Sequence, residues 1–311
     1  MNPLSIATFT NIGYTLHSRG HDPIDNDMTG KTVIITGGTG GLGRAAATAI
    51  AGLGARTVVV GRSPEKLRAA KREIAGDVVG YEADLGLMAE VRRLVDRLLA
   101  GESHLDVLIN NVGVLLPNRE TTEEGIEKTL ATDLAGHFLM TNLLIPRLVQ
   151  SAPSRVVNVT SGGMYAEKIQ PDDLQFERRE YKGTAAYAHA KRGQVILTRM
   201  WAERLDGTGV SVHAMHPGWA RTAGVERSLP MFNSVMRPFL RTPEQGADTI
   251  VWLASSPEVT TNSGQLWFDR EIVPEHMMER TRESAEDRES VWARLVELTG
   301  SDLPTSSGIG L

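Results

Sequence analysis

The stretch KTVIITGGTGGLG, residues 31–43, decides the fold. Lys31-Thr36 is a short β-branched run, which is typical of a buried strand. A glycine cluster follows the run, and an alanine-rich helical pattern from Arg44 to Leu53 follows the cluster. Strand, tight turn and helix in this order predict the first half of a βαβ unit, from which parallel sheets are built.

Further apolar runs follow along the chain, with helical patterns between most of them. They are Thr57-Val60, Val78-Tyr81, Asp106-Ile109, Arg155-Val159, Val210-Met215 and Gln265-Phe268. The runs hardly alternate between apolar and polar residues, as expected for strands that are covered on both faces. We therefore predict an α/β, doubly wound Rossmann fold whose seven-stranded, mostly parallel sheet has helices on both faces.

The pattern divides the chain into an N-terminal arm (1–29), one domain (30–272) with a lid around 223–242, and a C-terminal helix and tail (273–311). Apolar residues recur at helical spacing in the arm and in the tail: Ile6, Phe9, Ile12 and Leu16, then Val291, Trp292, Leu295 and Leu298. The arm stripe predicts either a helix packed on the domain or a contact with a partner or a lipid surface. The sequence leaves both open.

Composition narrows the class of protein. The net charge of −5 argues against a nucleic-acid surface, and the absence of cysteine excludes disulfides, thiol nucleophiles and cysteine metal sites. Because no stretch approaches the ~20 apolar residues of a membrane span, and no signal peptide is evident, we expect a cytoplasmic protein without a transmembrane segment. His213 and His216 are too few ligands for zinc, so we expect no metal.

The glycine cluster predicts a phosphate-binding turn. A diphosphate must approach backbone N–H groups at a helix N-terminus, where side chains would block it. The turn residues are Gly37, Thr39, Gly40, Gly41, Leu42 and Gly43. A glycine-rich turn without a ligand is the alternative, and the flanking strand and helix argue against it.

Arg62 and Ser63 follow the second strand, where an NAD site would place an acid for the ribose 2′-hydroxyl. A guanidinium pairs instead with a 2′-phosphate through parallel hydrogen bonds. We therefore predict NADP(H) as the cofactor, against the alternative of a solvated arginine at a strand end.

Tyr187 and Lys191 stand four residues apart in a helical pattern and so share one face. A nearby ammonium favours the phenolate, so Lys191 is predicted to lower the tyrosine pKa and make it an acid–base group. Ser161 follows the strand Arg155-Val159 and would hold a substrate oxygen beside Tyr187. Alone, such a pair could be a solvated surface contact.

In this order, the motifs resemble the short-chain dehydrogenase/reductase family, and the long segment from Ser161 to Lys191 resembles its retinol-dehydrogenase-like branch. The remaining matching motifs are Asp84-Leu85, Asn110-Asn111-Val112-Gly113 and Pro217-Gly218 with Thr222. The resemblance implies that Asp84 and Leu85 lie at the adenine and Asn110 and Asn111 beside its ribose. It also implies that Lys191 binds the nicotinamide ribose, that Pro217, Gly218 and Thr222 cover the nicotinamide, and that the protein is a homo-oligomer.

Asp133 departs from the family pattern, which has asparagine there as the support of a water relay to the lysine. We expect the aspartate to keep the backbone role and to weaken the effect of Lys191 on Tyr187 through its charge. Asp133 is therefore counted with the catalytic residues.

We expect a reversible hydride transfer between NADP(H) and a carbonyl or alcohol. The apolar segment Leu229 to Leu240 favours a lipophilic substrate, which Trp219 would touch. The alternative is a sensor or scaffold that binds NADP(H) without turnover.

Overall fold

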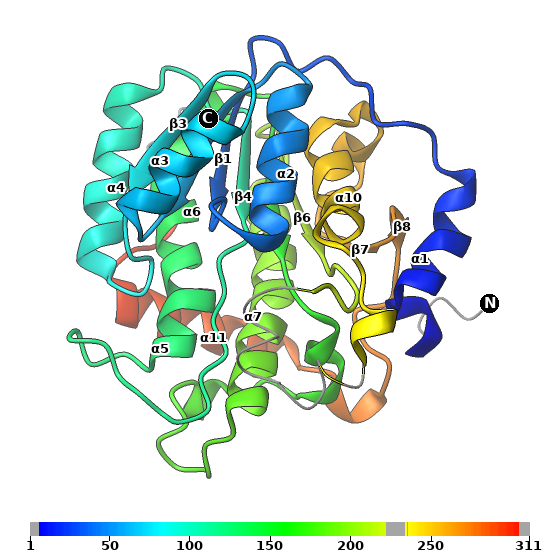
Figure 1. Ribbon diagram of the computed structural model, residues 1–311. Helices are drawn as coiled ribbons and strands as arrows, with labels where there is room; N and C mark the ends of the chain where they lie inside the picture. The colour runs from blue at the N-terminus through cyan, green and yellow to red at the C-terminus, as the bar shows by residue number, and fades with distance from the viewer. Residues whose placement is uncertain (1–5, 222–233, 235, 305–311) are drawn as a thin grey trace.

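The computed structural model describes residues 6–221, 234 and 236–304 (Figure 1). One eight-stranded sheet runs through it in the order β3-β2-β1-β4-β5-β6-β7-β8. The strands are β1 (Thr32–Thr36), β2 (Arg56–Gly61), β3 (Val78–Glu82), β4 (Val107–Asn110), β5 (Ser154–Val159), β6 (Val210–Met215), β7 (Leu266–Phe268) and β8 (Glu271–Ile272). The doubly wound fold is confirmed.

The predicted number of strands was one too low. The first seven strands are parallel, and β8 pairs with β7 in the antiparallel direction. Asp269 and Arg270 make the tight turn between them with positive φ angles of 49° and 61°. A two-residue strand is too short to produce an apolar pattern, so no periodicity in the sequence indicates it.

Helices cover both faces of the sheet (Figure 1). One layer consists of α2 (Gly41–Gly52), α3 (Pro64–Glu73) and α10 (Pro243–Ser255), and the other of α4 (Met88–Gly101), α6 (Gly136–Gln150), α7 (Gly183–Arg204) and α11 (Ala285–Thr299). Along β1, Val33 and Ile35 pack with the first layer and Ile34 packs with the second. Both faces of the strand are buried, which explains the unbroken apolar runs.

Shorter helical segments connect these layers. They are η1 (Ile6–Phe9), α1 (Asn11–His17), η2 (Ser18–Gly20), α5 (Lys128–Leu130), the π-helical turn η3 (Ala131–Ala135), η4 (Gly162–Ala166), η5 (Pro171–Asp173), η6 (Arg237–Phe239), η7 (Pro257–Thr261) and η8 (Glu279–Thr281).

Local sequence signals fix where the long helices begin. Ser63 caps α3 through a hydrogen bond from the Lys66 amide, and proline occupies the first helical position. Thr242 and Gln245 form a capping box at the start of α10, again followed by proline. Each cap places a helix start at the carboxyl edge of the sheet, where the loops of a doubly wound fold bind ligands.

The N-terminal arm lies against the end of the sheet formed by β7 and β8 (Figure 1). Phe9 is buried, whereas Ile12 and Leu16 are 56% and 38% exposed. The predicted apolar stripe therefore contributes Phe9 to the domain and leaves Ile12 and Leu16 at the surface.

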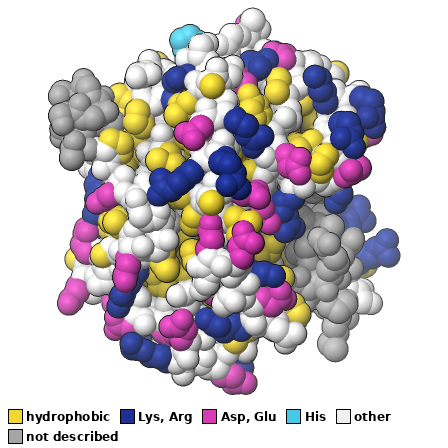
Figure 2. All heavy atoms as spheres, turned by 90° about the vertical axis from the view of Figure 1, so that its left-hand side faces the viewer, with side chains coloured by type: hydrophobic (Ala, Val, Ile, Leu, Met, Phe, Trp, Pro, Cys, Tyr) yellow, Lys and Arg dark blue, Asp and Glu magenta, His cyan; other side chains and the backbone are white. Residues whose placement is uncertain are grey.

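On the side of the molecule where α4 is outermost, acidic and basic side chains are interspersed with apolar ones (Figure 2). Within the described residues, the helices are all too short or too polar to cross a lipid bilayer.

Candidate active site

The glycine turn lies between β1 and α2 and leaves the start of the helix open. Gly37 and Gly41 have positive φ angles of 69° and 52°, which favour glycine. A Cβ on Gly43 would lie 2.5 Å from both the Gly37 oxygen and the Asn111 Nδ2, whereas one on Gly40 would meet nothing within 4 Å. No side chain caps α2, so its first N–H groups stay available to an anion. The turn therefore fits a diphosphate.

Thr36 and Asn111 hold this turn to the neighbouring strand β4. The Thr36 hydroxyl accepts hydrogen bonds from the amides of Asn111 (2.8 Å) and Val112 (3.0 Å), and Asn111 Nδ2 donates to the Thr36 oxygen (2.8 Å). Thr36 was not among the predicted site residues. Its position at the strand end, directly before the glycines, is the signal that could have identified it.

Asn110 and Leu85 point into the interior. Asn110 Nδ2 donates to Thr141 Oγ1 and to Asn158 Oδ1, each at 2.9 Å, and its side chain is buried. Leu85 is 3% exposed and packs in the core. These two residues could therefore contact a cofactor only through their backbone atoms. The Asp84 side chain, in contrast, is partly exposed and accepts a hydrogen bond from the Gly86 amide.

Arg62, Ser63 and Thr39 surround the end of β2. A Cβ on Gly61 would lie 2.9 Å from Thr39 Cγ2, so the glycine lets the phosphate turn approach this strand. The Arg62 side chain is 66% exposed, with Nη1 3.5 Å from an Asp84 carboxylate oxygen. Ser63 donates to Glu65 Oε2 (2.8 Å). The long, exposed contact leaves the Arg62 guanidinium accessible to a ligand anion.

The predicted catalytic residues meet at the carboxyl edge of the sheet. Ser161 follows β5, and its hydroxyl accepts from the Gly163 amide (3.2 Å) at the start of η4. The same hydroxyl shares a hydrogen bond with the Tyr187 phenol. Lys191, one turn later on α7, has its Nζ 5.5 Å from the centre of the Tyr187 ring. Two hydroxyls and an ammonium are thus brought together.

Lys191 and Asp133 form a buried ion pair behind the tyrosine. Lys191 Nζ lies 3.6 Å from Asp133 Oδ2, and their side chains are 2% and 0% exposed. Lys191 Nζ also donates to the Val159 oxygen (3.1 Å), and Asp133 Oδ1 accepts from the Val114 amide (2.7 Å). A Cβ on Gly113 would come within 3.0 Å of Asp133 Oδ2, so glycine makes room for the pair.

Asp133 lies on the π-helical turn η3. Such turns are rare and are often found at functional sites. Burial raises the pKa of the Asp133 carboxyl to about 7, even though Lys191 and the Val114 amide lower it. Burial lowers the pKa of Lys191, and Asp133 opposes that shift. An ionised Asp133 thus favours the charged form of the lysine, which burial disfavours.

The pKa of Tyr187 differs from the sequence-based expectation. We expected Lys191 to lower it, but it is raised above its ordinary value in this structure. The largest cause is burial of the phenol, followed by the charge of Asp133, and the hydrogen bond from Ser161 acts in the opposite direction. Burial of the phenol is the main physical reason for the difference, and the charge of Asp133 adds to it.

The loop after β6 lies next to the phosphate turn. A Cβ on Gly246 of α10 would lie 2.5 Å from Leu42 Cδ2 and 3.5 Å from Pro217 Cβ, so both residues pack on the same glycine. Trp219 is half-buried, with its ring centroid 5.9 Å from that of Phe9. Thr222, and the lid residues up to 233, lie outside the described residues.

His213 and His216 pack inside the protein. His213 Nε2 lies 3.1 Å from Ser211 Oγ, and the His216 ring stacks on Phe268 at 4.2 Å. Both side chains are buried, and burial lowers both pKa values to about 3, so the rings are neutral.

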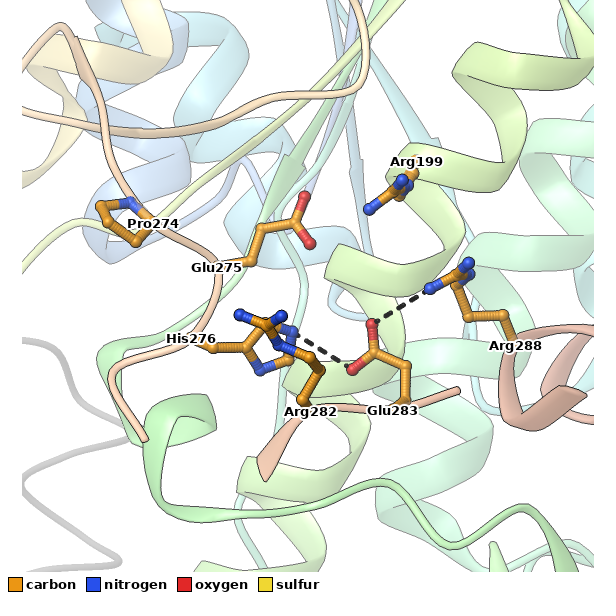
Figure 3. Close-up of a pocket in the computed structure, with 7 residues that line it drawn as sticks. All are labelled: Arg199, Pro274, Glu275, His276, Arg282, Glu283 and Arg288. Carbon is orange, nitrogen blue, oxygen red and sulfur yellow. Dashed lines mark ion pairs between the residues drawn. The ribbon is translucent and has the colours of Figure 1, made fainter. Parts of the chain in front are cut away.

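A separate cavity of about 410 Å³ lies beside α7 and is lined by Glu275, His276, Glu283 and three arginines (Figure 3). Glu275, His276 and Glu283 each offer one possible metal-ligand atom, and these atoms lie within 4.8 Å of one another. No other such group of three occurs among the described residues. Glu283 already pairs with His276 (3.4 Å) and Arg288 (3.9 Å). The surrounding arginine charges therefore disfavour a bare cation there.

The chain is similar to known proteins over most of its length. The family model described as short chain dehydrogenase matches residues 31–231. Dehydrogenase/reductase SDR family member 12 of Bos taurus is 38% identical, covering 94% of both chains, and human retinol dehydrogenase 14 is 37% identical, covering 90% of both. A solved structure from Mycobacterium paratuberculosis is 29% identical and superposes with a TM-score of 0.75, covering 90% of this chain and 97% of the other. The chain therefore belongs to the short-chain dehydrogenase/reductase family of oxidoreductases, in its retinol-dehydrogenase-like branch, and its cofactor is a nicotinamide dinucleotide.

Proposed function

We propose that the protein catalyses reversible hydride transfer between NADP(H) and a lipophilic aldehyde, ketone or alcohol. The observation that carries the proposal is the hydrogen-bonded pair of Ser161 and Tyr187, with Lys191 one helical turn away at the carboxyl edge of the sheet. In the reductive direction the Tyr187 hydroxyl gives its proton to the carbonyl oxygen while Ser161 donates a hydrogen bond to that oxygen. The dinucleotide supplies the hydride.

Different residues would bind different parts of the cofactor. The N–H groups at the start of α2 would hold the diphosphate, and Thr39, Ser63 and Arg62 would surround a 2′-phosphate. Lys191 would donate to the nicotinamide ribose, since it is fixed by Asp133 and by the Val159 oxygen. Pro217 and Gly218 would cover the nicotinamide from the side of α10.

A lipophilic substrate is supported by two observations. The retinol dehydrogenase among the relatives is named for an apolar alcohol. In addition, Phe239, which lies within the predicted lid, is 43% exposed. Apolar pockets with few convergent polar groups are typical of sites for such ligands.

A carbonyl panel tests this proposal. Purified protein is mixed with NADPH or NADH and with long-chain aldehydes, retinal, steroid ketones and small polar aldehydes, and absorbance at 340 nm is followed. We expect turnover of apolar carbonyls with NADPH, and a large loss in Ser161→Ala. Faster reduction of the small polar aldehydes, or a preference for NADH, would contradict the substrate or cofactor assignment.

A non-catalytic NADP(H)-binding sensor or scaffold is the second candidate. Asp133 favours it, because its charge raises the pKa of Tyr187 and so makes the phenol a weaker acid. Tight NADPH binding without reduction of any carbonyl in the panel would support this candidate and exclude the enzyme.

A further inference from the structure

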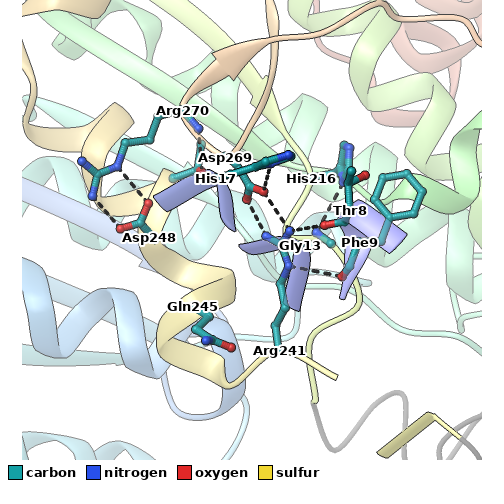
Figure 4. A network of polar contacts seen from close by, with 12 residues as sticks. Thr8, Phe9, Gly13, His17, His216, Arg241, Gln245, Asp248, Asp269 and Arg270 are labelled. Carbon is teal, nitrogen blue, oxygen red and sulfur yellow. Dashed lines mark hydrogen bonds and ion pairs between the residues drawn. The ribbon is translucent and has the colours of Figure 1, made fainter. Parts of the chain in front are cut away.

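A buried arginine from just before α10 binds the N-terminal arm to the domain (Figure 4). The Arg241 guanidinium donates to the backbone oxygens of Thr8 (2.7 Å), Phe9 (3.2 Å) and Thr10 (3.3 Å). It also makes a bidentate ion pair with Asp269, with 2.9 Å between Nη2 and Oδ2. Asp269 is in turn 2.9 Å from His17 Nδ1.

This pair is isolated from water. The side chains of Arg241 and Asp269 are 1% and 3% exposed. Breaking a buried pair leaves a charge without a partner, which is strongly destabilising. The position of the arm on the domain is therefore well defined, although Ile12 and Leu16 face outward.

The arm also holds the loop that follows β6. The Trp219 amide donates to the Phe9 oxygen (2.8 Å), and the Arg241 amide donates to the Trp219 oxygen (2.8 Å). Gly218 has a φ of 69°, and a Cβ there would lie 2.6 Å from Arg241 Nε and 2.8 Å from the Phe9 oxygen. Gly218 thus lies between the arm and Arg241, and there is no space at this position for a residue larger than glycine.

The Phe9 ring connects this loop to the catalytic serine turn. Its centroid is 5.2 Å from that of His216, 5.9 Å from Trp219 and 5.4 Å from Phe268. A Cβ on Gly162, the residue after Ser161, would lie 3.8 Å from Phe9 Cζ. One side chain of the arm therefore packs against the Pro217–Trp219 loop and lies next to the Ser161–Gly163 turn, in one apolar cluster with Met164.

We propose that Phe9 is a positioning residue of the active site: held by Arg241 and Asp269, it fixes the Ser161–Gly163 turn relative to the Pro217–Trp219 loop. The proposal rests on the proposed function for its kinetic consequence. Hydride transfer requires the substrate oxygen and the nicotinamide in one narrow geometry, and a displacement of about 1 Å costs on the order of 100-fold in rate. Phe9 touches neither reactant and acts through Ser161 and Trp219.

The test compares Phe9→Ala with Phe9→Leu, which keeps most of the apolar volume, and with Ile12→Ala, an exposed site on the same arm. Turnover is normalised to the number of NADPH sites titrated by fluorescence, so that unfolded protein does not count. We expect kcat per site to fall about 10-fold or more in Phe9→Ala, with recovery in Phe9→Leu, no change in Ile12→Ala, and an NADPH Kd within about two-fold of the original. An unchanged kcat per site in Phe9→Ala would overturn the proposal.

Hydrogen exchange separates this proposal from the proposed function. If no carbonyl is reduced by the unaltered protein, the enzyme assignment fails, but the coupling is still measurable. Phe9→Ala is expected to speed exchange at the Gly163 amide, which donates to Ser161 Oγ, while leaving the Lys66 amide at the start of α3, which donates to Ser63 Oγ, unchanged. Unchanged exchange at Gly163 would reject the coupling whether or not the protein is active.

Discussion

At the residue scale, the chemistry depends on Tyr187, whose pKa is raised by some of its neighbours and lowered by others. The hydrogen bond from Ser161 favours the phenolate, whereas burial and the charge of Asp133 favour the phenol. The sequence predicted the three catalytic side chains by type and spacing. It also predicted that the charge of Asp133 would oppose Lys191. It could not predict the burial of the phenol or the 3.6 Å approach of Asp133 to Lys191, which depends on a π-helical turn and on Gly113, both of which are packing features.

Asp133→Asn tests this balance. Removing the carboxylate removes a cause of the raised Tyr187 pKa, so that pKa should fall. In the direction of alcohol oxidation, which needs the phenolate, the midpoint of the kcat profile should move to lower pH. A midpoint that stays in place or moves to higher pH would show that Asp133 does not act on Tyr187.

The pH dependence of the free energy of unfolding is a second measurement on Asp133→Asn. The pKa of Asp133 is raised from 3.8 to about 7 on folding, so the folded state holds this proton more tightly than the unfolded state. The contribution is most favourable below the unfolded pKa and is lost as pH rises through about 7. Denaturant unfolding should therefore show a decline over this range that Asp133→Asn reduces.

Arg62→Ala should lower NADPH affinity about 10- to 100-fold while leaving NADH affinity nearly unchanged, because a hydrogen bond to a charged group contributes about 1.5–3 kcal/mol. Arg68→Ala on α3, an exposed arginine paired with Glu65, is the matched control. Titration of both variants with both cofactors measures the effect. Equal losses for NADPH and NADH would mean that Arg62 does not contact the 2′-phosphate.

At the element scale, the start of α2 determines whether a dinucleotide can bind. Its glycines were predicted from the strand–turn–helix order, and the structure adds the role of Thr36 and Asn111 in fixing the turn. The direction in which each side chain points could not be predicted from the sequence. The adjacent residues Asn110 and Asn111 point to different places, one into the core and one to the turn.

Gly43→Ala should abolish NADPH binding, because the new methyl group would lie 2.5 Å from the Gly37 oxygen and displace the turn. Gly52→Ala at the far end of the same helix is the control, since a Cβ there meets nothing within 4 Å. It should leave binding unchanged and stability equal or higher, as alanine is the better helix former. Unchanged NADPH affinity in Gly43→Ala would argue against a diphosphate site at the glycine turn.

At the scale of the whole molecule, the central strands were predicted nearly to the residue because both sheet faces are buried and leave an unbroken apolar signal. The eighth strand and the position of the arm were beyond the sequence. Arg241 and Thr8 are joined by a hydrogen bond across 233 residues, and no local pattern encodes such a contact.

The C-terminal helix α11 is expected to stabilise the whole domain. Trp292 is 5% exposed, its ring packs edge-on against Phe138 at 4.9 Å, and its indole N–H donates to Asp302 (2.8 Å). Trp292→Ala should cost about 3–5 kcal/mol, which lowers Tm by about 10 °C. Arg294→Ala, at an exposed position of the same helix, should stay within about 0.5 kcal/mol. Similar melting curves for the two variants would mean that the helix is not part of the folding unit.

The most direct test of the catalytic assignment is single-turnover oxidation of bound NADPH by the unaltered protein and by Tyr187→Phe, with a reducible carbonyl in excess. The phenylalanine keeps the ring and removes the proton donor. We predict that NADPH binds both proteins equally and that its absorbance at 340 nm decays at least about 100-fold more slowly in the variant. Equal decay in the two proteins would contradict the role of Tyr187 as the acid.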